Sequence, residues 1–167
     1  YLETTHGSII MEFGQQGHLK GDLVSGDQIR LNAEGDLTIS GHLTSKGDIH
    51  LASEDLSGDS VLEMTPTAWI RTQPDPLVPT LITLTSPGLI VIDGAIGSLK
   101  SSDGFRNPAD VTIQSQERIL ITEASGWVES DGRIQLEAPV VDVSGVIKNA
   151  SASAPDSEDG QMRQEHF

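Results

Sequence analysis

The sequence contains no cysteine, few aromatic residues and no long apolar segment, and each absence narrows the interpretation. Because none of the 167 residues is cysteine, a disulfide framework and thiolate metal sites are excluded. Only 4% of the residues are aromatic, which is low for a compact sandwich core but enough for a narrow interior of Ile, Leu and Val. No apolar run reaches the roughly 18 residues of a membrane-spanning helix, so we expect no membrane span.

Basic residues are also scarce. Ten Lys and Arg residues stand against 25 Asp and Glu residues, which gives a net charge of −15. The acidic residues are spread along the whole chain, and this pattern predicts a solvated acidic surface rather than an acidic tail. Such a surface repels phosphate backbones, so we predict no nucleic-acid partner. The chain begins at Tyr1 and shows no signal peptide, so we interpret it as a processed product, a fragment or a subunit.

A short pattern recurs along the chain: a glycine, a polar residue that is usually Asp, and then two apolar residues around a third residue. It occurs in residues 26–31, 35–39 and 47–51, and a looser copy occupies residues 132–136. Each copy predicts a tight turn followed by a short strand, and repetition of such a unit is typical of a solenoid. The best internal alignment places residues 17–19 on 41–43 and residues 25–31 on 46–51. The natural unit is therefore a coil of about twenty residues with two or three strands.

These patterns predict an all-β solenoid over residues 1–148 and a polar, flexible tail over residues 149–167. Five prolines fall within residues 65–87. Because proline cannot donate to a β-ladder, we predict that this segment is a Pro-rich insertion that leaves the sheets.

The residues in 35–41, 43–52 and 132–138 resemble the β-helix repeats of filamentous haemagglutinin and related proteins of two-partner secretion. The likeness covers roughly residues 7–147. It implies a right-handed parallel β-helix, a location outside the cell or on the bacterial surface, and an adhesive or scaffolding role. It transfers no catalytic residue. The repeat pattern of residues 17–51 also resembles that of bactofilins, which are cytoskeletal β-helices that polymerise end to end.

Four sets of residues are candidates for a site, and each set has a structural alternative. The Gly-Asp turns could bind Ca²⁺, or the Asp side chains could cap the local backbone. His18, His42 and His50 could form a metal row, or they could lie on solvated strand faces. Trp69 and Trp127 could stack on sugars, or they could cover the ends or seams of the coils. A row of acids could support glycoside hydrolysis, or it could reflect the acidic composition alone; these acids are Asp93, Asp103, Asp110, Glu137 and Asp142. Asn149, Ala150 and Ser151 form a glycosylation sequon.

From these observations we predict no catalytic residue, no cofactor and no enzymatic activity, and we assign no metal ligand. The leading hypothesis is an extracellular structural or adhesive segment of a bacterial surface or fibre protein. The first alternative is a filament subunit that polymerises end to end, and the second is a carbohydrate-active enzyme on a β-helix. The expected partners are further solenoid segments or copies of the chain, and a host-surface or carbohydrate ligand.

Overall fold

The computed structural model of the chain describes residues 1–55, 57–73, 79–97 and 109–149. These ranges contain nineteen strands and no helix, so the described chain has no helix that could cross a lipid bilayer. The strands form three sheets, of seven, six and six strands, and every neighbouring pair is parallel. The predicted all-β class is therefore confirmed.

In the first sheet the order of strands is β1 (Leu2–Thr4), β4 (Leu23–Ser25), β7 (His42–Ser45), β10 (Trp69–Thr72), β13 (Ala95–Gly97), β16 (Trp127–Ser130) and β19 (Val146–Asn149). The order in the second sheet is β2 (Ile9–Phe13), β5 (Ile29–Ala33), β8 (Ile49–Ser53), β11 (Thr80–Ser86), β14 (Ala109–Ser115) and β17 (Ile134–Glu137). In the third sheet it is β3 (Gln16–Leu19), β6 (Asp36–Ile39), β9 (Val61–Met64), β12 (Leu89–Ile92), β15 (Arg118–Ile121) and β18 (Val140–Val143).

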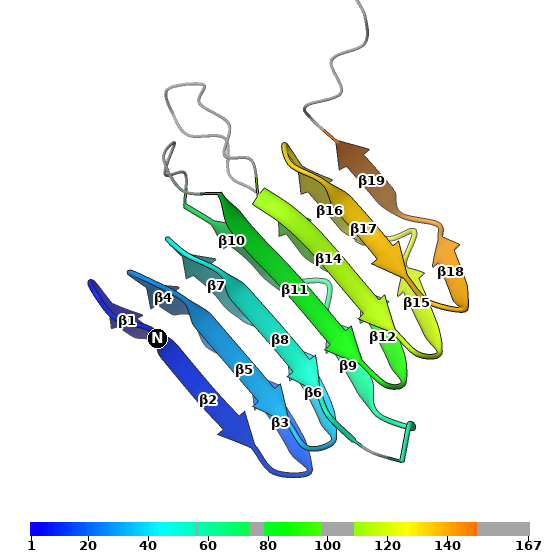
Figure 1. Cartoon of the computed structure of the whole chain (residues 1–167), viewed down its shortest axis with the longest axis horizontal. Helices are drawn as coiled ribbons and strands as arrows, with labels where there is room; N and C mark the ends of the chain where they lie inside the picture. Colours follow the sequence, from blue (N-terminus) through cyan, green and yellow to red (C-terminus); the bar gives the residue numbers. More distant parts are fainter. Residues whose placement is uncertain (56, 74–78, 98–108, 150–167) are drawn as a thin grey trace, which may run out of the picture.

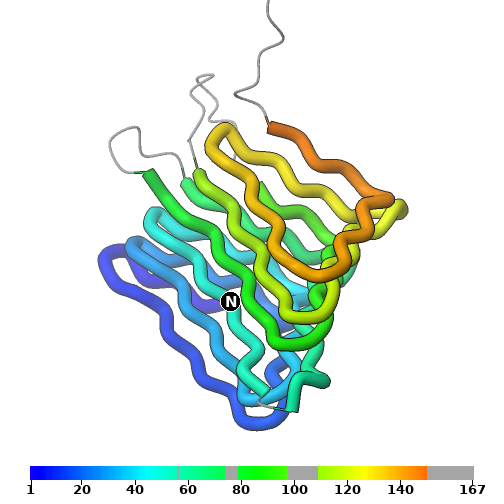
Figure 2. The backbone as a smooth tube through the Cα atoms, turned by 45° about the vertical axis from the view of Figure 1, so that its right-hand side comes forward, coloured from blue at the N-terminus to red at the C-terminus, as the bar shows by residue number. Residues whose placement is uncertain are grey.

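Consecutive strands visit the three sheets in strict rotation. Each strand pairs with the strand three places further along the chain, so one coil of three strands lies directly beside the next. Figure 1 shows the coils side by side in chain order, from the coil that begins with β1 at the blue end to β19 at the orange end. Figure 2 shows the backbone repeating this path coil after coil. The arrangement is consistent with a parallel β-helix, or solenoid.

The core consists of apolar columns that run from coil to coil. Within β5, Ile29 and Leu31 are fully buried while Arg30 between them is exposed, as the alternation in the sequence predicts. Register places like residues above one another, and the main columns are Ile9-Ile29-Ile49-Ile82-Val111, Leu31-Leu51-Leu84-Ile113, Leu37-Leu62-Ile90-Ile119 and Leu23-Leu43-Ile70-Ile96-Val128. Burial of each such side chain stabilises the fold by about 1.5–3 kcal/mol.

The spacing between coils is regular at first and then lengthens. Twenty residues separate Ile9 from Ile29 and Ile29 from Ile49, which agrees with the predicted coil length. The next step in this column, from Ile49 to Ile82, is longer. The internal alignment of residues 17–19 with 41–43 was wrong, because Gly17 pairs with Leu37 in the third sheet. Similar short sequences occur at different corners of one coil, and the alignment matched two corners that are not equivalent.

The prediction that the segment 65–87 leaves the sheets was wrong, since this segment contains β10 and all of β11. Pro66 precedes β10, Pro79 immediately precedes β11, and Pro87 immediately follows it. At these positions a missing N–H removes no ladder hydrogen bond, so the prolines bound the strands instead of interrupting them. Pro74 and Pro76 lie outside the described residues, as does the predicted tail from residue 150 onward.

The Gly-Asp pattern lies at the corners of the coils, as predicted. Gly26 lies between β4 and β5, and Gly47 lies between β7 and β8. A Cβ atom added at Gly26 would lie 2.0 Å from the Thr5 carbonyl oxygen, and one at Gly47 would lie 2.4 Å from the Asp27 carbonyl oxygen. The glycines are therefore required by the close approach of the neighbouring coil, because the backbone of the coil before each corner fills the space of a side chain.

Buried serines connect the same corners. The Ser45 hydroxyl is fully buried, donates to the carbonyl oxygen of Asp27 in the preceding coil at 2.6 Å, and accepts the Gly47 N–H at 3.2 Å. Ser25 repeats this arrangement, and so do Ser86, Ser115 and Ser130. Each hydroxyl thus satisfies one carbonyl of the coil before it and one N–H of its own corner.

Candidate functional site

Three aspartates that follow a corner glycine bond to the next coil, whereas Asp27 accepts the Ser8 hydroxyl of the preceding coil at 2.7 Å. The three carboxylates accept backbone N–H groups from the next coil; the pairs are Asp22 with His42 at 3.3 Å, Asp36 with Val61 at 2.9 Å, and Asp48 with Leu81 at 2.8 Å. The prediction that these Asp side chains accept backbone N–H groups was therefore correct. It was wrong in placing those N–H groups in the same turn, because they belong to the next coil. Within the described ranges, no group of three or more His, Asp or Glu side chains is placed to hold a metal ion.

The three histidines proposed as a metal row lie on three different sheets. His18 is in β3 of the third sheet, where its Nε2 atom lies 3.0 Å from the Ser40 hydroxyl. His42 is in β7 of the first sheet, and His50 is in β8 of the second. The expected vertical adjacency of His18 and His42 is wrong, because it depended on the mistaken coil alignment.

The acids proposed as a catalytic row are dispersed and already bonded. Asp93 accepts hydrogen bonds from Thr122 and Ser125, and Asp142 pairs with Arg118. Asp110 and Glu137 lie in neighbouring strands of the second sheet. Their partners are the Arg133 N–H at 2.7 Å and the Gln114 side-chain amide at 2.6 Å. Asp103 lies outside the described residues. These contacts do not assemble a carboxylate pair around a common space.

The two tryptophans are brought together by the register of the first sheet. Trp69 in β10 pairs with Ala95 in β13, and Ala95 pairs with Trp127 in β16, so the three residues occupy one row across three strands. Two residues further along each strand, Arg71, Gly97 and Glu129 follow in the same order. A groove of about 290 Å³ lies among these residues, and we call it the tryptophan slot. Its walls carry large side chains, while β13 between them has Ala95 and Gly97 at its outward positions and the buried Ile96 between them.

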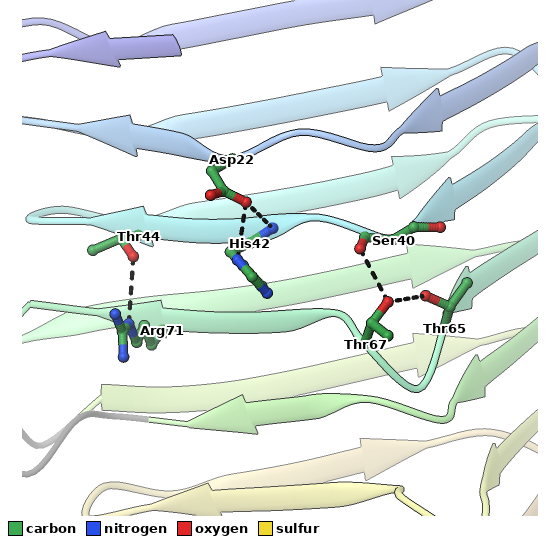
Figure 3. Close-up of polar contacts among 7 residues, drawn as sticks. All are labelled: Asp22, Ser40, His42, Thr44, Thr65, Thr67 and Arg71. Carbon is green, nitrogen blue, oxygen red and sulfur yellow. Dashed lines mark hydrogen bonds and ion pairs between the residues drawn. The ribbon is translucent and has the colours of Figure 1, made fainter. Parts of the chain in front are cut away.

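Trp69 forms one wall and is held by its neighbours. The His42 ring stacks on it with a centroid distance of 4.4 Å and an interplanar angle of 16°. The Nδ1 atom of His42 lies 2.9 Å from the Asp22 carboxylate, which orients the imidazole (Figure 3). The Arg71 guanidinium carbon lies 3.6 Å from the Trp69 ring centroid, and its Nε–H donates to Thr44 at 3.4 Å (Figure 3). The stack, the cation–π contact and the hydrogen bond together fix this wall before any ligand enters.

Trp127 forms the opposite wall and is more open, with 38% of its surface exposed. Its indole N–H donates to the Glu129 carboxylate at 3.2 Å, and Lys148 approaches the same carboxylate at 3.0 Å. Partial burial lowers the pKa of Arg71 on the facing wall from its ordinary value. The slot therefore places a cation and a carboxylate beside two aromatic rings.

A larger hollow of about 570 Å³ lies where the second sheet turns into the third. It is lined mainly by polar and proline side chains, including Gln114, Gln116 and Glu137. It contains no aromatic ring, and the Glu137 carboxylate already accepts hydrogen bonds from Gln114 and Gln135. The tryptophan slot is smaller, but it combines stacking surface with charged groups, so it is the better candidate for a ligand site.

Sequence reasoning selected Trp69 and Trp127 separately and missed the residues between and beside them. Arg71, Ala95, Gly97 and Glu129 carry no motif, and only the strand register joins them to the tryptophans. The spacing Trp-x-Arg in β10 and Trp-x-Glu in β16 was the available signal, because residues two apart on a strand share one face.

No protein-family model, curated protein or solved structure matches the chain. The function proposed below therefore depends on the geometry of the chain itself.

Proposed function

We propose that the chain is a segment of a right-handed parallel β-helix with a structural and adhesive role at a bacterial cell surface, of the filamentous-haemagglutinin kind. The observation that carries this proposal is the rotation of strands through three parallel sheets with continuous apolar columns. Parallel crossover connections are right-handed in about 98% of cases, which supports the proposed handedness. A stack of this kind presents long lateral faces of outward side chains, as an adhesive scaffold requires.

We infer that the role is binding and not catalysis. The acids that could have formed a hydrolytic pair are engaged by different donors on different strands. A glycosidase needs two carboxyl groups about 5–10 Å apart on either side of the scissile bond. The feature that gathers side chains around a common space is instead the tryptophan slot, whose stacking surface suits recognition.

The test concerns location and adhesion. With an antibody raised against the chain, we expect the epitope on intact source cells and its removal by externally added protease. Beads coated with the folded chain should adhere to host-cell or matrix surfaces more than beads coated with heat-unfolded chain. Access of the antibody only after lysis, or equal adhesion of the two bead preparations, would contradict this function.

A filament subunit is the second candidate, and one observation favours it. Val141 and Val143 of β18 continue the buried columns of Ile119 and Ile121, yet they are 38% and 46% exposed. Ile147 of β19 continues the column of Val128 and is 39% exposed. These side chains and the open edges of β17–β19 form an apolar face that a further coil could cover.

Sedimentation velocity over a range of concentrations distinguishes this candidate. If the face mediates end-to-end assembly, the wild-type chain should form larger species as its concentration rises. The double substitution Val141→Glu and Val143→Glu should keep it monomeric. The matched control is Val91→Glu, because Val91 lies mid-stack at an outward position of β12. A wild-type chain that stays monomeric at every concentration excludes the filament.

A further inference from the structure

We propose that the tryptophan slot binds one pyranose ring of an uncharged glycan. This inference deepens the adhesive role proposed above and depends on it for its biological meaning. It follows from the width of the slot, the orientation of its walls, its polar groups and the charge of the chain.

The width suits a single ring. Trp69 and Trp127 occupy the same row of the first sheet with one strand between them. Neighbouring strands lie about 4.8 Å apart, so the two tryptophan backbones are roughly 9.6 Å apart. The intervening row position is Ala95, whose methyl group forms a low floor. The groove of about 290 Å³ is slightly smaller than the smallest typical small-ligand pockets, whose volumes begin near 300 Å³.

The orientation of Trp69 follows from its stacking partner. His42 and Trp69 are paired across neighbouring strands, and their rings lie nearly parallel with centroids 4.4 Å apart. This distance is close to the strand spacing. The indole ring therefore projects away from the sheet, with its plane perpendicular to the row that joins neighbouring strands. The wall formed by Trp69 and Arg71 therefore faces along the row toward β13 and Trp127. A ring that enters over Ala95 would lie between this wall and the indole of Trp127.

The polar groups match a sugar better than a purely apolar ligand. A pyranose presents C–H groups on its faces and hydroxyl groups around its edge. The exposed indole of Trp127 suits the faces, while the Arg71 guanidinium supplies donors and the Glu129 carboxylate supplies acceptors for the hydroxyls. Glu129 is held in place by the Trp127 N–H and by Lys148, so its orientation is set before a ligand arrives. Gly97 between Arg71 and Glu129 leaves room for the edge of the ring.

The charge of the chain selects for an uncharged glycan. With a net charge of −15 and Glu129 in the slot itself, the surface repels sulfated and uronate-rich polysaccharides. The single positive charge of Arg71 does not overcome the repulsion between this negative surface and a polyanion. An aromatic side chain of a protein could also stack in the slot, but it would not use the donors and acceptors around it. Stacking by a protein partner is therefore an outcome that the test must distinguish.

The test uses the two tryptophans as reporters, since they are the only ones in the chain and both line the slot. The whole chain is titrated with cello-, chito-, malto- and manno-oligosaccharides while its tryptophan emission is followed, and isothermal calorimetry measures the affinities. We expect saturable binding of at least one uncharged oligosaccharide. Polygalacturonate, heparin and an aromatic tripeptide, which represent anionic glycans and protein side chains, should produce no saturable signal.

Three variants locate the site. Trp127→Ala should weaken binding roughly tenfold, while Trp127→Phe should retain most of it. Ala95→Phe should abolish binding because it fills the floor of the slot and leaves both walls unchanged. Circular dichroism and a urea unfolding curve establish that each variant is folded. Val91→Ala, at an outward position on a different sheet, is the matched control and should bind as the wild type does.

The proposal is overturned if no uncharged glycan binds, if Trp127→Ala and Ala95→Phe bind as the wild type does, or if the anionic glycans or the tripeptide bind more tightly. These failures differ from a failure of the adhesive function. Beads that adhere without any glycan binding would leave adhesion standing and remove the slot. A slot that binds glycan in a chain confined inside the cell would support the site and contradict the surface role.

Discussion

Gly41 gives the sharpest test of how the coils stack. A Cβ atom added there would lie 1.9 Å from the carbonyl oxygen of Gly21 in the preceding coil. Ordinary contacts begin at 3.4 Å, so Gly41→Ala would require the two backbones to separate by roughly 1.5 Å. Two hydrogen bonds span the same corner: the Ser40 N–H donates to Leu19 at 2.8 Å, and the His42 N–H donates to Asp22 at 3.3 Å.

The expected cost follows from these contacts. Overpacking in a close-packed interior costs about 1–3 kcal/mol. Lengthening two hydrogen bonds adds up to about 1 kcal/mol for each. The lower entropy of alanine in the unfolded chain returns about 0.4–1 kcal/mol. We therefore expect Gly41→Ala to lower the free energy of unfolding by about 3 kcal/mol.

Urea unfolding followed by circular dichroism measures this change, and Gly14→Ala is the matched control. Gly14 lies in the turn between β2 and β3, and an added Cβ atom there has no neighbour within 4 Å. Its substitution should change the free energy of unfolding by less than about 0.5 kcal/mol. If Gly41→Ala is as stable as the wild type, or if the two substitutions cost the same, the backbones of the two coils are not in close contact at this corner.

Two further predictions concern the polar groups at the corners. Ser45→Ala should lower the free energy of unfolding by about 1–3 kcal/mol, because it removes a buried hydroxyl that donates to one coil and accepts from its own corner; urea unfolding measures this, with exposed Ser144→Ala as the control. The Ser57 backbone N–H lowers the pKa of Asp55. An NMR titration should therefore place its midpoint below the ordinary value of 3.8, and the stabilisation should be lost as the pH falls through that midpoint.

Either result can contradict its premise. Equal stability of the two serine variants would mean that the buried hydroxyls do not connect the coils. A midpoint for Asp55 at or above its ordinary value would mean that the bond from Ser57 is absent in solution. Ser57→Ala should raise the midpoint only in part, because the backbone N–H remains.

Much of the solenoid could be predicted from local sequence. The alternation in residues 29–33 and 49–53 predicts β5 and β8, and glycine at a corner predicts where each strand begins. The strand β10 was not predicted, because its four residues lie between prolines that dominate the composition of the segment. A segment has the same proline content whether its prolines flank a strand or replace one. Only the pairing of β10 with β7 and β13 shows that a strand is present.

The tryptophan slot could be predicted only in part. Each tryptophan is visible in the sequence, but their common row depends on the lengths of every connection between β10 and β16. These lengths vary from coil to coil, so a period taken from the regular first coils does not extend to the later ones. The histidines were placed in one row for a different reason, because the alignment of residues 17–19 with 41–43 joined two different corners of the coil.

The twenty-residue step from Ile9 to Ile29 and from Ile29 to Ile49 also bears on how such a chain can change during evolution. Because each coil contacts only its neighbours, an in-frame duplication or loss of one twenty-residue unit would bring like residues back into the same columns. Corner glycines and serines would again meet carbonyl groups of the adjacent coil. The early coils can therefore be copied or deleted to set the length of the protein, while the slot between β10 and β16 is carried along unchanged.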